Sequence, residues 1–264
     1  MPPRTVRYGS RRDQFLELTL PDGDGAVPVA VVLHGGFWRA AHGVELARPL
    51  AADLAAAGWG AVAVEYRRVG AGGGWPDTLL DVAAALDALP DLPEARRLDL
   101  TDLTVVGHSA GGHLAAWAAG RGRLPEGAPG AGPRVRVTAA VLQAGVLDLA
   151  VAAEQDLGAG AVRAFLSARP GEASERWASA DPVQLLPTGA AVLCIHGADD
   201  DVVPVQQSEG YAAAAAAAGD AVDVRIVPGD HMVLIDPGGD AWQLVRNWLG
   251  ERRTERVKRI TLDP

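Results

Sequence analysis

The stretch Leu103–Ala119, "LTVVGHSAGGHLAAWAA", decides the fold. Its apolar start, residues 103–106, has the composition of a buried strand and leads directly into "GHSAG", residues 107–111, which fits the pattern G-x-S-x-G. The next residues, 112–119, are typical of a helix. A sharp turn from strand to helix strains the central serine, and glycines flank it because side chains there would collide with neighbouring backbone. The stretch predicts a nucleophilic Ser109 at a helix N-terminus, the alternative being a tight turn without chemistry.

Short apolar, β-branched runs recur along the chain and alternate with segments of helical spacing. This alternation is typical of an α/β fold with a mostly parallel sheet covered by helices on both faces. A polar-alternating stretch, residues 14–20, suits an antiparallel strand at the sheet edge. The predicted buried strands are 29–33, 61–64, 103–106, 137–142, 191–195 and 222–227, and the other predicted helices are 44–57, 78–89, 205–218 and 241–249.

The length and apolar content favour one domain. The chain has 264 residues, 48% of them hydrophobic, with no internal repeat and no linker long enough to divide it, so we expect a single domain over residues 1–264. Residues 145–189 interrupt the alternation and predict a small cap over the functional edge of the sheet, with a short helix near 161–167. The charged tail, residues 251–264, is expected to be peripheral or frayed.

Charge and hydropathy exclude several classes of partner. The net charge is −9, with Arg and Lys scattered along the chain, so a nucleic-acid partner is not expected. The N-terminus lacks an apolar core of signal-peptide length, and no run reaches the ~20 apolar residues that a membrane helix needs. We expect a soluble, cytoplasmic protein without a membrane partner, and a homodimer stays open. The lone Cys194 lies in an apolar run and is interpreted as a packing residue.

A serine hydroxyl is a weak nucleophile at neutral pH, so Ser109 needs a base. The chain has six histidines. Five of them lie in turn motifs, a loop, a helix or a strand end. His231 lies in the loop after the last predicted strand, and its place late in the chain fits the order serine, acid, histidine expected for this type of turn. His231 is therefore the predicted base.

The acid that orients the base is expected after the strand 191–195. Three consecutive aspartates, residues 199–201, occur there, and such a run is also common in solvated turns and helix caps. One carboxylate is enough to hold a single imidazole tautomer and to stabilise the imidazolium. The register is open, with Asp200 preferred and Asp199 as the second choice.

The glycines of "LHGGFWR", residues 33–39, predict half of an oxyanion hole. Two preorganised backbone N–H groups stabilise the oxyanion of acyl transfer, and the loss of one such donor costs ~10²–10³ in rate. One donor is expected from Ala110, the residue after the nucleophile, and the other from this early loop. Because glycines let the backbone turn toward substrate, the candidates in the loop are the N–H groups of Gly36 and Phe37.

Side chains beside the two motifs are candidates for contact with substrate. Phe37 and Trp38 either wall the acyl pocket or anchor their loop, and a buried anchor is preferred for Trp38. His108, next to Ser109, is a further candidate for the substrate pocket. Arg39 either meets a substrate carboxylate or forms a surface ion pair, and the ion pair is preferred.

Taken together, "HGGFW", "GHSAGGHLA", "HGADDDVVP" and "PGDH" resemble the α/β-hydrolase superfamily, over about residues 14–249. Within it, the H-G-G-x-W loop joined to G-H-S-A-G-x-H is similar to the kynurenine formamidase (arylformamidase) group and its esterase relatives. The resemblance implies an α/β-hydrolase fold and hydrolysis of N-formylkynurenine to kynurenine and formate. By residue it implies Ser109 as nucleophile, His231 as base, Asp200 as acid, and an oxyanion hole at Ala110 and the loop of Gly36.

The sequence therefore predicts a serine hydrolase that cleaves a small carboxylic ester or aryl formamide through an acyl-enzyme. No cofactor and no metal are expected, because no metal-ligand spacing such as H-E-x-x-H occurs. Two alternatives stay open. One is acyl transfer to an alcohol or amine on the same triad, and the other is a catalytically silent binding module on a hydrolase scaffold.

Overall fold

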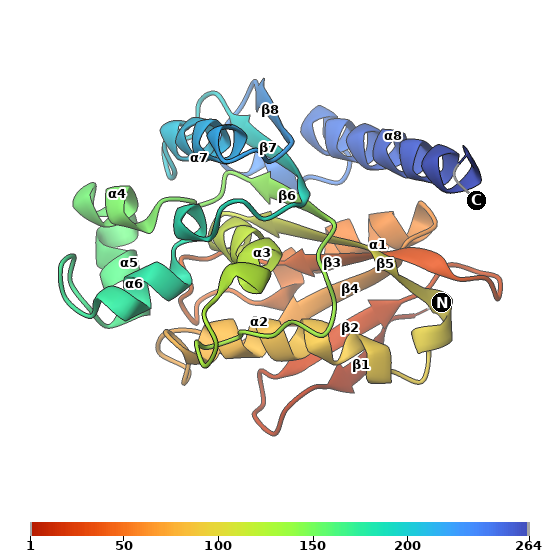
Figure 1. Ribbon diagram of the computed structural model, residues 1–264, viewed down its shortest axis with the longest axis horizontal. Coiled ribbons are helices and arrows are strands. Elements are labelled where there is room, and N and C mark those ends of the chain that lie inside the picture. Colours follow the sequence, from red (N-terminus) through yellow and green to blue (C-terminus); the bar gives the residue numbers. More distant parts are fainter. Residues whose placement is uncertain (1, 263–264) are drawn as a thin grey trace.

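A computed structural model describes residues 2–262 and shows an eight-stranded sheet covered by helices on both faces (Figure 1). The strand order is β1-β2-β4-β3-β5-β6-β7-β8. The first two strands are antiparallel to their neighbours and the remaining pairs are parallel, so the predicted α/β class is confirmed. The strands are β1 (Arg4–Arg7), β2 (Phe15–Thr19), β3 (Val27–Leu33), β4 (Gly60–Glu65), β5 (Leu98–His108), β6 (Ala139–Gln143), β7 (Ala191–Gly197) and β8 (Val222–Val227).

Two apolar cores lie on opposite faces of the sheet. β3 supplies Val29 and Val31 to one core and Ala30 and Val32 to the other, because successive side chains of a strand point to opposite faces. Buried residues of α2, α3 and α7 belong to the first core, and those of α1 and α8 to the second. These helices are α1 (Arg48–Ala56), α2 (Asp77–Asp87), α3 (Ala110–Gly120), α7 (Gln206–Ala217) and α8 (Asp240–Leu262).

The first predicted helix, 44–57, is divided in the structure. A short 3₁₀ turn covers Val44–Leu46, and α1 then starts at Arg48 with Pro49 in its first turn. Proline has no N–H and a fixed φ, so it is accommodated in the first turn of a helix and not in its interior. The periodic leucines of this segment therefore predicted the right face but not the start of the helix.

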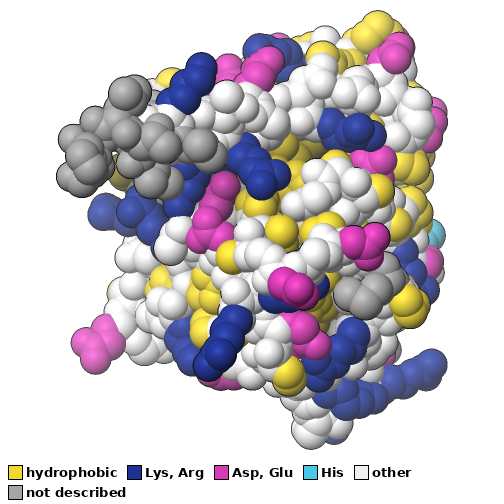
Figure 2. Space-filling model, turned by 90° about the vertical axis from the view of Figure 1, so that its right-hand side faces the viewer, with side chains coloured by type: hydrophobic (Ala, Val, Ile, Leu, Met, Phe, Trp, Pro, Cys, Tyr) yellow, Lys and Arg dark blue, Asp and Glu magenta, His cyan; other side chains and the backbone are white. Residues whose placement is uncertain are grey.

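Of the two alternatives predicted for the charged tail, peripheral or frayed, the structure contradicts only the second. Helix α8 continues to Leu262, so residues 251–262 are helical and not frayed, while 263–264 lie outside the described residues. Arg252 donates to Asp102 Oδ1 at 2.7 Å and to Thr138 Oγ1 at 3.0 Å, and Arg256 donates to Thr101 Oγ1 at 2.7 Å. These bonds fix α8 to the strand β5 and to the segment before β6. On the face of the molecule in Figure 2, basic and acidic side chains are interspersed with hydrophobic ones.

The segment predicted as a cap, 145–189, lies between β6 and β7 and holds three helices (Figure 1). It packs on α3, because Trp117 Nε1 donates to Ser179 O at 2.8 Å and the His113 ring bonds to Ala180 O at 2.9 Å. Among residues 2–262, no helix combines the length and apolarity needed to cross a bilayer. The cap helices are α4 (Leu149–Glu154), α5 (Leu157–Leu166) and α6 (Ser174–Ala180).

Glycines let the start of α3 approach the ends of β5 and β3. A Cβ on Gly107 would lie 2.0 Å from Gly111 O, and a Cβ on Gly111 would lie 2.1 Å from Leu33 O. Both contacts are with backbone, which cannot move aside as a flexible side chain could. The predicted need for glycines on both sides of Ser109 therefore has a direct steric cause.

We expect Gly111→Ala to lower the free energy of unfolding by about 3 kcal/mol or more, since its Cβ overlaps the backbone of β3. The melting temperature should fall by about 2–4 °C for each kcal/mol. Gly122→Ala is the matched control, because nothing lies within 4 Å of its Cβ. Thermal unfolding of both variants checks the prediction, and equal melting temperatures for the two would contradict it.

Candidate active site

Ser109 occupies the turn between β5 and α3 in a strained backbone conformation. Its φ is 56° and its ψ is −120°, a region that non-glycine residues rarely adopt. The surrounding structure holds it there: Ser109 N donates to Gln143 O at 2.8 Å, and Ser109 O accepts from His113 N at 3.1 Å. The residue is 3% exposed. The serine of the predicted turn therefore lies at the N-terminus of α3, fixed from β6 and from the helix itself.

The structure brings the predicted base and acid together. His231 follows β8, Asp200 follows β7, and His231 Nδ1 lies 2.6 Å from Asp200 Oδ2. The other oxygen of Asp200 accepts from Val202 N at 2.9 Å and from Val203 N at 2.8 Å. These bonds aim one carboxylate at one ring nitrogen, which is the geometry that orients an imidazole.

Of the three aspartates, Asp200 is the one that contacts the His231 ring. Asp199 turns instead to the backbone and accepts from Gly229 N at 3.2 Å, and Asp201 is exposed to solvent. Burial would raise the pKa of Asp200, but hydrogen bonds from His196 and His231 outweigh it and hold the pKa well below its usual range. Asp200 is thus a buried carboxylate that stays ionised at neutral pH.

His108 holds the loop of His231 against the strand-to-helix turn. Its Nε2 lies 2.9 Å from His231 O, and the two rings are 4.4 Å apart. The residue is 6% exposed and its ring also lies against Gly35; its place in the substrate pocket stays a prediction. Between residues 2 and 262 no hydrogen bond joins Ser109 Oγ to the His231 ring; such bonds are often long before substrate binds.

The predicted oxyanion donors have free N–H groups. Within the described residues, the N–H groups of Gly36, Phe37 and Ala110 donate to no protein acceptor. The loop passes beside the nucleophile, because a Cβ on Gly35 would lie 3.1 Å from Ser109 Cβ. Gly36 has a φ of 108°, which glycine adopts at no steric cost. Unsatisfied backbone donors beside a serine are the groups that an oxyanion requires.

A buried network that sequence reasoning missed supports this loop from β4. Glu65 Oε1 accepts from Tyr66 N at 2.9 Å and lies 3.0 Å from His34 Nε2 and 3.1 Å from Arg68 Nη1. The Tyr66 ring stacks on His34 at 4.2 Å, and its hydroxyl donates to His34 O at 2.6 Å. The available signal was the sequence "EYRR", residues 65–68, at the end of a strand adjacent to β3, but the sequence at a strand end does not show which residues it will contact.

The cap supports the same loop from the other side. Arg39 Nη2 donates to Gly158 O at 2.6 Å and to Ala159 O at 3.0 Å, and within residues 2–262 Arg39 forms no ion pair, so the preferred surface ion pair is wrong. The Phe37 ring lies against Gly158, where a Cβ would come within 2.6 Å of it. The two carbonyl groups that accept from Arg39 lie in a turn with left-handed backbone, where φ is 59° at Gly158 and 50° at Ala159.

Trp38 is an anchor and not a pocket wall. It is fully buried, its ring stacks on Phe165 of α5 at 4.7 Å, and its Nε1 donates to His113 Nδ1 at 3.1 Å. The sequence favoured a buried anchor for Trp38. Contact with substrate, the other alternative, does not fit a side chain that is fully buried. Trp38 therefore joins the oxyanion loop, the cap and α3 in one packed cluster.

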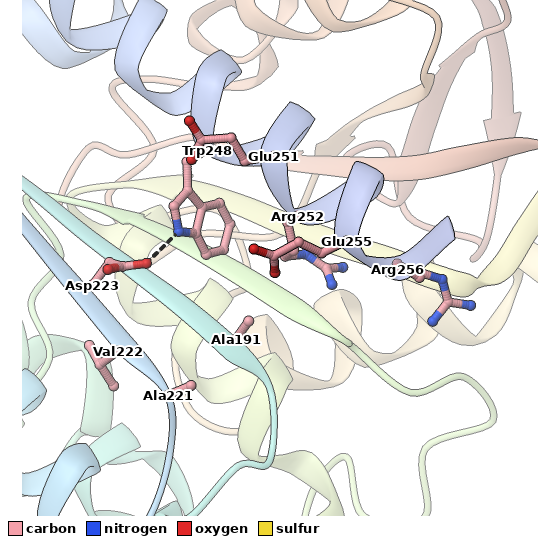
Figure 3. Close-up of a pocket in the computed structure, with 9 residues that line it drawn as sticks. All are labelled: Ala191, Ala221, Val222, Asp223, Trp248, Glu251, Arg252, Glu255 and Arg256. Atoms are coloured by element: carbon pink, nitrogen blue, oxygen red, sulfur yellow. Dashed lines mark hydrogen bonds between the residues drawn. The ribbon is translucent and has the colours of Figure 1, made fainter. Parts of the chain in front are cut away.

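A cavity of about 710 Å³ lies away from this site, between α8 and the amino ends of β7 and β8 (Figure 3). Its lining includes Trp248, whose Nε1 donates to Asp223 Oδ2 at 2.7 Å, and Arg252. Ser109, Asp200 and His231 follow the carboxyl ends of their strands, so this cavity is at the opposite end of the sheet. In the part of the chain that the structure describes, no group of three or more His, Cys, Asp or Glu side chains could hold a metal ion.

The fold and the carboxyl-end arrangement of serine, aspartate and histidine define an α/β-hydrolase. The sequence model of the BD-FAE family matches residues 16–214, and the chain belongs to this family of α/β-hydrolase esterases. Over 198 residues the chain is 32% identical to "Probable carboxylic ester hydrolase LipM" of Mycobacterium tuberculosis. The match covers 72% of this chain and 46% of LipM, so the chain spans less than half of that relative.

Solved esterases share the fold at low sequence identity. A truncated carbohydrate esterase from gut microbiota superposes with a TM-score of 0.81 at 22% identity, covering 95% of each chain. The acetyl ester-xyloside bifunctional hydrolase of Caldicellulosiruptor lactoaceticus gives a TM-score of 0.76 at 22% identity and covers 94% of this chain and 96% of its own. These likenesses establish the architecture.

Two buried histidines should make stability depend on pH. Burial lowers the pKa of His108 to about 3 and that of His113 to about 4. Both values lie below the ~6.5 of an unfolded chain, so the folded protein binds fewer protons. Their contribution to stability is complete above pH ~6.5 and is lost as the pH falls toward the folded values.

We therefore expect the free energy of unfolding to fall from pH ~6.5 to pH ~4.5, measured by urea unfolding. His113→Gln should flatten this slope. His42→Gln is the control, since His42 is exposed. If the free energy of unfolding fell with pH equally steeply in both variants, His113 would not be a source of the pH dependence.

Proposed function

We propose that this chain is a serine hydrolase that cleaves a small carboxylic ester or an aryl formamide through an acyl-enzyme. The observation that carries the proposal is the strained Ser109 at the N-terminus of α3, with the His231–Asp200 pair held against the same turn by His108. Membership of the BD-FAE family and the similarity to LipM support ester hydrolysis. The H-G-G-x-W and G-H-S-A-G-x-H motifs support the formamide.

In the proposed first half-reaction, Ser109 Oγ attacks the carbonyl carbon of the substrate while His231 Nε2 takes the hydroxyl proton. Asp200 accepts from His231 Nδ1 and stabilises the imidazolium that forms. The carbonyl oxygen becomes an oxyanion, which accepts from Ala110 N–H and from the N–H of Gly36 or Phe37. When the tetrahedral species collapses, His231 returns the proton to the leaving alcohol or amine.

In the second half-reaction, water attacks the acyl-enzyme while His231 takes one of its protons. Collapse expels Ser109 Oγ, which regains a proton from His231, and releases the carboxylic acid; from a formamide the acid is formic acid. If an alcohol or amine replaces water, the product is a new ester or amide, and the same groups perform acyl transfer. A silent binding module is the alternative from another class, and it has no need for the hydrogen-bonded Asp200–His231 pair.

We expect wild-type protein to hydrolyse short p-nitrophenyl esters and Ser109→Ala to lose turnover by at least about 10³-fold. Comparison of kcat/KM for N-formylkynurenine with that for the short ester decides between the two substrate classes. A strong preference for the formamide, abolished by Ser109→Ala, supports the arylformamidase proposal. Turnover of the ester without turnover of the formamide would contradict the arylformamidase proposal and support a carboxylesterase. Folded protein that turns over neither substrate and resists a fluorophosphonate label would favour the binding module.

Asp200→Asn should lower kcat by about 10⁴-fold, because the amide reverses the tautomer that the carboxylate selects at His231. Asp201→Asn is the matched control: its side chain is exposed and makes no bond to His231 among the described residues, so its rate should stay near that of wild type. Steady-state kinetics of the two variants checks the assignment of the acid. Equal losses at both positions would overturn it.

A further inference from the structure

His196, at the end of β7, is a wholly buried histidine outside the predicted triad. Its Nε2 lies 3.2 Å from Asp200 Oδ2 and 2.8 Å from Val203 O. Its Nδ1 lies 2.7 Å from Ser208 Oγ, which belongs to α7 and is also fully buried. Sequence reasoning passed over His196 as a strand end. The structure instead places it in contact with the carboxylate that faces His231.

The neighbours of His196 fix its tautomer. Both atoms beside Nε2, a carboxylate oxygen and a carbonyl oxygen, are acceptors, so Nε2 carries the hydrogen. Within the described residues the Ser208 hydroxyl has only His196 Nδ1 as a partner, so its hydrogen is directed to the Nδ1 lone pair. His196 is therefore a neutral ring that receives a hydrogen bond from Ser208, donates one to Val203 O and places the same N–H beside Asp200 Oδ2, with 3.2 Å between the nitrogen and the oxygen.

This arrangement occupies the whole carboxylate of Asp200. Oδ1 accepts from Val202 N and Val203 N, and Oδ2 is shared by His231 Nδ1 and His196 Nε2. A carboxylate offers about four lone-pair sites, and three hydrogen bonds together with the contact from His196 leave none open to water. The side chain of Asp200 is 1% exposed, which makes an unfilled site costly.

We propose that His196 and Ser208 are positioning residues for the hydrolytic reaction, and that Ser208, His196, Asp200 and His231 act as one buried polar unit behind Ser109, joined by hydrogen bonds and by the contact between His196 and Asp200. Ser208 fixes the tautomer of His196, and His196 fixes the plane and the charge of Asp200. The inference rests on the proposed function, because it assumes that Asp200 orients the base. It adds two residues, one from β7 and one from α7, that the triad alone does not include.

Other titratable groups lie around this unit. His108 contacts the His231 ring, but burial keeps its pKa at about 3, so it stays neutral in the working range of a hydrolase. Asp199 and Asp230 bond to backbone N–H groups of Gly229 and Met232. A change at His196 therefore acts on His231 through Asp200. Loss of the N–H beside Oδ2 leaves more charge on that oxygen, which stabilises the imidazolium of His231.

The first experiment needs no substrate, so its outcome is independent of the proposed function. Nuclear magnetic resonance of isotope-labelled histidine nitrogens in the full chain reports the tautomer of each ring. We expect His196 to hold its hydrogen on Nε2. In Ser208→Ala the Nδ1 resonance of His196 should shift. A His196 ring with its hydrogen on Nδ1 would overturn the proposal.

The second experiment compares His196→Gln, whose amide can still donate to Asp200, with His196→Met, which cannot. For His196→Met we expect the acid limb of kcat/KM to move up by about half a pH unit or more, with a loss of up to about 10²-fold in rate. His196→Gln should recover most of both. Equal behaviour of the two variants would refute the role of the hydrogen bond.

Ser208→Ala decides the question if His196→Met does not fold. Its matched control is Ser179→Ala, a buried serine that bonds to Trp75 and Arg176 outside the unit. We expect Ser208→Ala to lower kcat with little change in KM and to move the acid limb, and Ser208→Thr to restore both. A Ser208→Ala profile that matches Ser179→Ala in rate and acid limb would overturn the positioning role.

Discussion

The close approach of backbone at the start of α3 is the constraint on which the structure depends. Gly107 and Gly111 let the helix begin directly against β5 and β3, with no room for a single Cβ. The approach forces Ser109 into its positive φ, points the helix N-terminus at the same spot and brings Gly35 against Ser109. Ser109, the N-terminus of α3 and the predicted oxyanion loop are thus placed by one steric condition, and the strain at Ser109 is compensated by packing around it.

Much of this arrangement is local and was predictable from the sequence. The strands follow from apolar runs, and the strand-to-helix turn follows from two glycines around Ser109. Asp200 and His231 come after the ends of β7 and β8, and parallel strands place their carboxyl ends at one edge of the sheet, so chain order alone brought them near. The end of a strand and the turn after it are determined by residues that are neighbours in the chain.

The remainder depends on partners far apart in the chain. The bonds from Arg252 to Asp102 and Thr138 turned a charged tail, which resembles a solvated segment, into part of α8. His196 and Glu65 each end a strand, and composition gives no sign of which carboxylate or histidine a buried group will face. Trp38 is likewise an anchor because residues far from it in the chain, Phe165 of α5 and His113 of α3, pack around it. A residue's hydrogen-bond partner is a property of the packed fold, not of the residue's neighbours in sequence.

The contacts between the cap and the oxyanion loop give the cap a role beyond shaping a binding site. Phe37, Trp38 and Arg39 all rest on the segment from Gly158 to Phe165. A displacement of that segment would withdraw the support of the donors, so the cap is not free to open and close as an independent lid. In the proposed reaction, insertions or deletions in this segment would change the rate together with the choice of substrate. Adaptation to a new substrate is then favoured at loops that leave this contact intact.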